Sequence, residues 1–295
     1  MTVAIYLPLL FALPLGRSAR WIAGRGRPAT TAWCLTVVAV IAALSSTWSL
    51  LLLALTILDD LPPLSALDDR PALALPEPVP DLVALAAGLF LLIAAWRLLA
   101  DLLRRIGTVR RLRAVGRPAD GLVVADWSAP MAVAVPGGTD AGHLLVTTGM
   151  LRLLDAAERR VVFAHERAHL RHHHHALVTA AAAAAAVNPL LIGMREAVAF
   201  LVERWADEEA AIAVGDRDLT AQAVARAALA TAGSGPAAGL GIGGGASVHR
   251  VRALGEPAPA HRRRRLLGPL ALTAGFVAAA AVATVEFVAL ARAWL

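Results

Sequence analysis

Residues 165–169 read His-Glu-Arg-Ala-His, and these residue types at this spacing can do hydrolytic chemistry. On an α-helix, positions four apart share one face, so His165 and His169 can direct two imidazole nitrogens at one metal ion. Glu166 lies beside any water on that ion, and its carboxylate can take the proton of that water and pass it to a leaving amine. The pentapeptide therefore predicts a zinc site that hydrolyses peptide bonds, with Glu166 as the general base.

Further histidines, His172 to His175, follow the pentapeptide. A histidine-rich run can bind metal loosely or form a basic surface turn, and we interpret this one as incidental. The single cysteine, Cys34, lies in an apolar segment and has no partner, which excludes disulfides and cysteine-rich zinc sites.

The composition indicates a membrane protein, because 58% of the residues are hydrophobic and the mean hydropathy is +0.64. Three apolar segments are long enough to cross a bilayer: 32–58, 82–103 and 268–291. Residues 1–16 are also apolar, and the basic residues follow this stretch instead of preceding it as in a signal peptide. We therefore expect residues 1–16 to form a first span.

Charges in the loops predict the orientation, since arginine gathers in cytoplasmic loops. The loop 17–31 and the cluster HRRRR at 261–265 are basic, as is the stretch after the third span, whereas 59–81 is acidic and rich in proline. We expect four spans in the plasma membrane with both termini outside. The region 104–267, which contains the pentapeptide, then faces the cytoplasm.

Within 104–267 the sequence favours a small α+β domain. Short β-rich runs predict an antiparallel sheet, and a helix beginning near Asp155 carries the histidines. The strand ending at Thr147 and Thr148 could serve as an edge that holds an extended peptide. Residues 232–246 read as a flexible glycine-rich linker. The three β-rich runs are 121–126, 131–135 and 143–148.

The apolar stretch 176–194 resembles a fifth span, but topology argues against that interpretation. If it crossed the membrane, later residues would lie on the opposite side from the histidines, and 261–265 would lie outside. Asn188-Pro189 offers a helix break instead. We therefore predict a helical hairpin over 170–210, with arms of about 27 Å and 20 Å at 1.5 Å per residue.

The return arm of this hairpin carries candidates for the third metal ligand. Glu203 and Asp207 lie four apart on one face, which suits a ligating carboxylate and an acid that orients a ligand histidine. A catalytic zinc with three protein ligands needs one more residue, and we favour Glu203. Spacing alone leaves the neighbouring acids open as alternatives: Glu196, Glu208 and Glu209.

These motifs together resemble the membrane zinc metallopeptidases of the BlaR/MecR type and the related heat-shock and prenyl-protein membrane proteases. The likeness rests on HLLVTTGMLRLLDAAERRVVFAHERAHL, on Asn188-Pro189-Leu190 and on the spacing from Glu203 to Asp207. It implies a gluzincin-like site in which Glu203 completes the ligands of one Zn²⁺ and Asp207 supports a histidine. A late arginine motif at 248–254 implies His249 or Arg250 as a stabiliser of the oxyanion, although a membrane-surface cation is the alternative.

One difference from that family is expected. The sensor-transducers carry a penicillin-binding domain after the fourth span, whereas this sequence stops at Leu295, so antibiotic sensing is not implied. The overall expectation is a mainly α multi-pass protein with membrane regions at 1–103 and 268–295 around the peptidase domain 104–267.

The expected function is that of a zinc-dependent endopeptidase acting on a cytoplasmic or membrane-proximal protein. The resemblance suggests a transcriptional repressor as substrate, and no direct contact with nucleic acid is expected. Two alternatives stay open: a protease for the quality control of membrane proteins, and a non-catalytic signalling protein that binds zinc.

Overall fold

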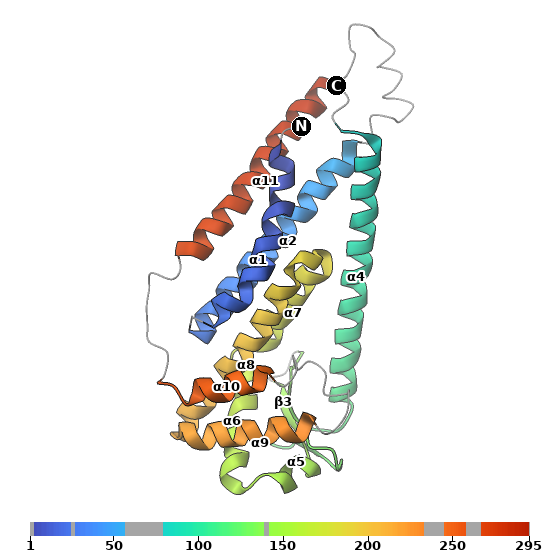
Figure 1. The fold of residues 1–295 in the computed structure, drawn as a ribbon. Coiled ribbons are helices and arrows are strands. Elements are labelled where there is room, and N and C mark those ends of the chain that lie inside the picture. The colour runs from blue at the N-terminus through green and yellow to red at the C-terminus, as the bar shows by residue number, and fades with distance from the viewer. Residues whose placement is uncertain are drawn as a thin grey trace.

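The structure is a computed structural model, which describes residues 3–24, 27–56, 79–138, 142–232, 245–257 and 267–294. Helices dominate it, and a small sheet lies at the end of the molecule away from the termini (Figure 1). In chain order the elements are η1 (Val3–Tyr6), α1 (Leu7–Ala23), α2 (Pro28–Leu55), α4 (Asp81–Arg113), β1 (Leu122–Ala125), β2 (Ala132–Val135), β3 (His143–Thr147), α5 (Thr148–Leu153), α6 (Ala156–Arg171), α7 (His174–Val187), η3 (Pro189–Leu191), α8 (Ile192–Val214), α9 (Arg217–Ala232), α10 (Gly245–Leu254) and α11 (Leu267–Trp294).

Three helices of the described part are long and apolar enough to cross a membrane: Pro28–Leu55, Asp81–Arg113 and Leu270–Ala289. They coincide with three of the four predicted spans. The fourth prediction, residues 1–16, falls on η1 and α1, and α1 has 17 residues and is not among these candidates. The number of spans and the orientation therefore stay predictions. The cluster 261–265 lies outside the described residues, as do most of the loop 59–81 and of the linker 232–246.

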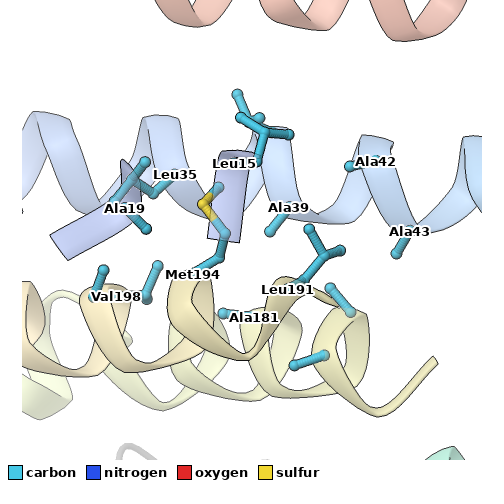
Figure 2. Close-up of a cluster of buried hydrophobic side chains, with 14 of the residues drawn as sticks. Leu15, Ala19, Leu35, Ala39, Ala42, Ala43, Ala181, Leu191, Met194 and Val198 are labelled. Atoms are coloured by element: carbon cyan, nitrogen blue, oxygen red, sulfur yellow. The ribbon is translucent and has the colours of Figure 1, made fainter. Parts of the chain in front are cut away.

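A core of small and apolar side chains joins α7 and α8 to α1 and to the candidate membrane span α2 (Figure 2). The backbones of α1 and of the hairpin are in close contact at two glycines. A Cβ on Gly16 would lie 2.0 Å from the backbone oxygen of Leu190, and a Cβ on Gly193 would lie 1.9 Å from that of Gly16. Only glycine fits at both positions, so α1 packs directly on the start of α8.

The hairpin turns at Asn188-Pro189, where α7 ends and η3 begins. The Asn188 side chain accepts a hydrogen bond from the Leu190 backbone N–H at 3.1 Å and donates one to Ser46 Oγ of α2 at 3.0 Å. The outbound arm is not one helix, however. His172 and His173 separate α6 from α7, and His173 adopts a left-handed conformation with φ 50°.

The sheet is mixed, so the prediction of an antiparallel sheet was wrong. Its strand order is β1-β3-β2, with β1 parallel and β2 antiparallel to β3. The segment 126–131 explains this order, because it passes the end of β3 and is bound there. Thr147 Oγ1 donates to Ala129 O at 2.8 Å and accepts from Met131 N at 2.9 Å, and Gly149 N donates to Trp127 O at 2.9 Å.

The prediction that the strand ending at Thr147 and Thr148 is an edge that holds a peptide was also wrong. β3 is the central strand and is buried along its length, whereas β2 forms an edge of the sheet. β2 lies against α6, which carries the histidines.

Candidate metal centre

Helix α6 holds the histidine pair in a fixed position. It begins with a capping box, in which Asp155 Oδ1 accepts from Glu158 N at 2.9 Å and Glu158 Oε2 accepts from Asp155 N at 3.0 Å. Glu158 also pairs with Arg226 of α9 at 2.8 Å. Val161, one turn before His165, is fully buried and packs in a cluster with Ala210 of α8. The histidines therefore face α8.

His165, His169 and Glu203 form a group that could hold a metal ion, since their ligand atoms all lie within 4.8 Å of one another. The two Nε2 atoms are 3.1 Å apart. Glu203 Oε2 lies 3.5 Å from His165 Nε2, and Glu203 Oε1 lies 3.6 Å from His169 Nε2. Ligands about 2.0 Å from a tetrahedral zinc are about 3.3 Å apart, so the three side chains fit such an ion.

Charges in this group are strongly coupled. Burial alone would lower the pKa of His165, but the carboxylates of Asp207 and Glu203 outweigh it and raise that pKa to about 10. Burial likewise opposes ionisation of Glu203, yet His165, His169 and Arg250 hold its pKa well below the usual value. The pocket thus favours a positive charge beside an ionised Glu203, which a divalent cation would supply.

His169 has the opposite shift from His165. Burial is the main reason why its pKa falls to about 4, so the ring is neutral at physiological pH. The neutral imidazole is the form that ligates metals.

Glu166 follows His165 on α6, and its side chain is bound to the sheet. Its Oε2 accepts a hydrogen bond from the backbone N–H of Ala134 in β2 at 2.8 Å. Burial raises the pKa of Glu166 to about 7, and the charge of His165 opposes this rise. A carboxyl with a pKa near neutrality can both accept and release a proton, as a general base and acid must.

Asp207 and Arg250 contact the residues of this group from α8 and α10. His165 Nδ1 lies 3.0 Å from Asp207 Oδ1, although the contact is not aligned as a hydrogen bond. Arg250 of α10 donates two hydrogen bonds of 2.7 Å to Asp207, and its Nη1 lies 3.0 Å from Glu203 Oε2. Its neighbour His249 is exposed. Of the two residues expected from the late arginine motif, the structure brings Arg250 into the site and not His249.

The alternative acids on α8 are engaged elsewhere. Glu196 pairs with Arg20 of α1, and Glu208 pairs with Arg217 at 2.6 Å. Glu209 lies 3.3 Å from Arg171. Among the four acids considered from the sequence, Glu203 is the one that reaches both histidines.

His174 is a part of the site that sequence reasoning missed. It is 1% exposed, its Nδ1 lies 3.1 Å from Nδ1 of His169, and its ring lies 4.5 Å from that of Trp205 between centroids. The signal was present in the histidine run, which we interpreted as incidental. His174 is five residues after His169, and the turn at His172–His173 brings the two rings together, which spacing on a continuous helix does not predict.

Two histidines four apart on one helix, a carboxylate from a second helix that reaches both, and a buried glutamate next to the first histidine are the arrangement expected of a metallopeptidase. Comparison with known families agrees, because residues 100–241 match the family model of peptidase family M48. The matched part of the chain is thus similar to that family, and it contains all the site residues described above except Arg250 on α10. Searches of curated proteins and of solved structures gave no significant match.

Proposed function

We propose that this protein is a membrane-bound zinc endopeptidase that cleaves a cytoplasmic or membrane-proximal protein. The observation that carries the proposal is the spacing of the ligand atoms of His165, His169 and Glu203, which suits a tetrahedral ion. The match of residues 100–241 to the family model of peptidase family M48 supports the same function.

Zinc bound here would polarise the scissile carbonyl and lower the pKa of a bound water. Glu166 would hold the proton of that water on its carboxylate and transfer it to the leaving amine. Asp207 would keep His165 oriented through Nδ1, so that Nε2 faces the ion. Arg250 supplies positive charge beside Glu203 and Asp207, and we assign it to positioning these two carboxylates.

The edge strand β2 is our candidate for the surface that holds the substrate. The Ala134 N–H points away from β3 and toward Glu166. An extended peptide that paired with this edge would place its scissile bond beside the general base. The hydrogen bond between Ala134 and Glu166 would then be exchanged for one to the substrate backbone.

We also propose that the peptidase domain faces the cytoplasm and that its proteolysis is regulatory. The third span α4 ends with Arg110, Arg111 and Arg113 in its last turn, which supports a cytoplasmic location for the domain that follows. A transcriptional repressor as substrate rests on the resemblance to the BlaR/MecR type.

Comparative proteomics of cells that carry the wild type or Glu166→Gln tests this function. We expect one or a few intact proteins to accumulate in the variant, because the metal ligands stay in place while the proton acceptor is lost. Glu256→Gln removes an exposed carboxylate outside the site and serves as the control. A repressor among the accumulated proteins supports regulation, and many unfolded membrane proteins support quality control. Equal proteomes for the wild type and Glu166→Gln would contradict the proposed peptidase activity.

A further inference from the structure

A cavity of about 360 Å³ lies between α4, the end of α7 and the start of α8, and it shares no residue with the metal centre. Figure 1 shows this place, where the tip of the hairpin lies beside the middle of α4. The chargeable residues of its lining are Arg97, Asp101 and Arg104 of α4 and Arg195 of α8.

The cavity carries an excess of positive charge. Arg195 is exposed and has no hydrogen-bond or ion-pair partner within the described part of the chain. Arg97 Nε donates to Ala186 O at the end of α7 at 2.9 Å, which fixes the guanidinium beside the cavity. The one acid of the lining, Asp101, accepts a hydrogen bond of 2.6 Å from Arg105, which is outside the lining, and its other oxygen lies 3.7 Å from Arg104 Nη2. The lining therefore holds three arginines and one carboxylate, which already has a partner in Arg105 outside the cavity.

The cavity lies where the apolar part of α4 ends. From Leu82 to Trp96 this helix has no charged residue, and most of its large side chains are exposed, with Leu92 71% and Trp96 70% accessible. Arg97 is the first charged residue after this stretch. Tryptophan and arginine gather at the boundary between bilayer and water, so we place the cavity at that boundary, on the side of the peptidase domain.

The other wall is apolar and built from small residues. Ala182, Ala185 and Ala186 of α7 line the cavity, and their short side chains leave the space beside α4 open. A ligand that fits here is anionic at one end and apolar at the other. A free phosphate would leave the apolar surface unused, and an acidic peptide would not match the exposed leucines of α4.

We propose that this cavity binds the phosphate headgroup of an anionic phospholipid, whose acyl chains lie along the exposed face of α4. Basic pockets between membrane helices bind such headgroups. The proposal does not depend on peptidase activity.

The test is native mass spectrometry of the full-length protein in detergent, titrated with phosphatidylglycerol or phosphatidylcholine. The double variant Arg104→Gln/Arg195→Gln removes two charges from the cavity and leaves the Arg97–Ala186 bond in place. The control Arg110→Gln/Arg111→Gln removes two exposed charges from α4 outside the lining. We expect roughly thirty-fold weaker binding of the first phosphatidylglycerol by the cavity variant, since each arginine near the headgroup contributes about fivefold.

We further expect no change for the control variant and weak, unaltered binding of phosphatidylcholine by all three proteins. Equal losses in both double variants would overturn the proposal, because they would indicate diffuse attraction to surface charge. Displacement of the lipid by inorganic phosphate at the same concentration would also overturn it in favour of a free anion. Stronger competition by a polyglutamate peptide than by lipid would indicate a protein ligand instead. Unchanged thermal midpoints establish that each variant is folded.

Discussion

At the scale of single residues, the contact between His174 and His169 suggests that His174 orients a metal ligand. If Nε2 of His169 ligates the ion, its Nδ1 carries the proton and donates it to Nδ1 of His174, 3.1 Å away. The ring of Trp205 holds His174 in this orientation.

We therefore expect His174→Ala to weaken zinc binding by about tenfold to a hundredfold, the usual effect of losing such an outer partner. Competition with a chromophoric zinc chelator measures this affinity. His175→Ala, which removes an exposed histidine of the same run, is the control and is expected to bind as the wild type does. Equal affinities for both variants would mean that His174 only fills space.

Arg250 is expected to matter for stability. Asp207 is 2% exposed and receives both of its short hydrogen bonds from Arg250. Arg250→Ala would leave a buried carboxylate beside His165 without its main counterion, which costs about 3–5 kcal/mol. We expect a clearly lower thermal midpoint than for His249→Ala, which changes the exposed neighbour. Matching midpoints would show that Asp207 does not need this arginine.

The residues of the site differ in how far the sequence could predict them. His165, Glu166 and His169 follow from local spacing on one helix. Choosing Glu203 over its neighbours needed the resemblance, because sequence spacing does not determine which face of α8 turns toward the histidines. Arg250 and His174 reach the site through tertiary contacts that sequence spacing does not predict. Arg250 was therefore one of two alternatives, and His174 was missed.

At the scale of elements, the close crossing of α1 and α8 fixes the hairpin that carries Glu203. The backbones touch at Gly16 and Gly193, and this contact leaves no space for a side chain.

Gly193→Ala is expected to force the two helices apart, at a cost of about 1–3 kcal/mol. The variant should have a lower thermal midpoint in detergent than the wild type. Gly107→Ala is the matched control, because a Cβ there meets nothing within 4 Å. A midpoint for Gly193→Ala as high as that for Gly107→Ala would contradict the tight crossing.

Elements were predictable where the local sequence decides the backbone conformation. Proline at 189 ends α7, and the apolar periodicity of 155–171 marks α6. The order of the sheet was not predictable in this way, because it depends on how 126–131 binds to the end of β3 through Thr147 and Gly149. The turn at His173 was missed because a left-handed histidine has no sequence signature of its own.

At the scale of the whole molecule, the hairpin links the peptidase domain to α1 and to the candidate membrane span α2. α8 packs on α1 and α2 at its start and carries Glu203 and Asp207 farther along. The site is thus built on a helix that packs on a candidate membrane span, which suits a substrate at or near the bilayer.

The orientation can be tested with single cysteines in a Cys34→Ala background. Arg111→Cys lies at the end of α4 next to the peptidase domain, and Ser65→Cys lies in the acidic loop. We expect a membrane-impermeant maleimide to label Ser65→Cys in intact cells and Arg111→Cys only after lysis, because arginine-rich ends stay in the cytoplasm. The reverse pattern would place the peptidase domain outside.

The zinc content of the purified full-length protein tests the central claim most directly. We predict one zinc per chain in the wild type and in Glu166→Gln, because Glu166 is not a ligand, and loss of that zinc in His169→Ala and in Glu203→Ala. Elemental analysis after zinc loading and removal of excess metal gives the result. Zinc retained by both ligand variants, or lost from Glu166→Gln while that variant stays folded, would contradict the site described for this protein.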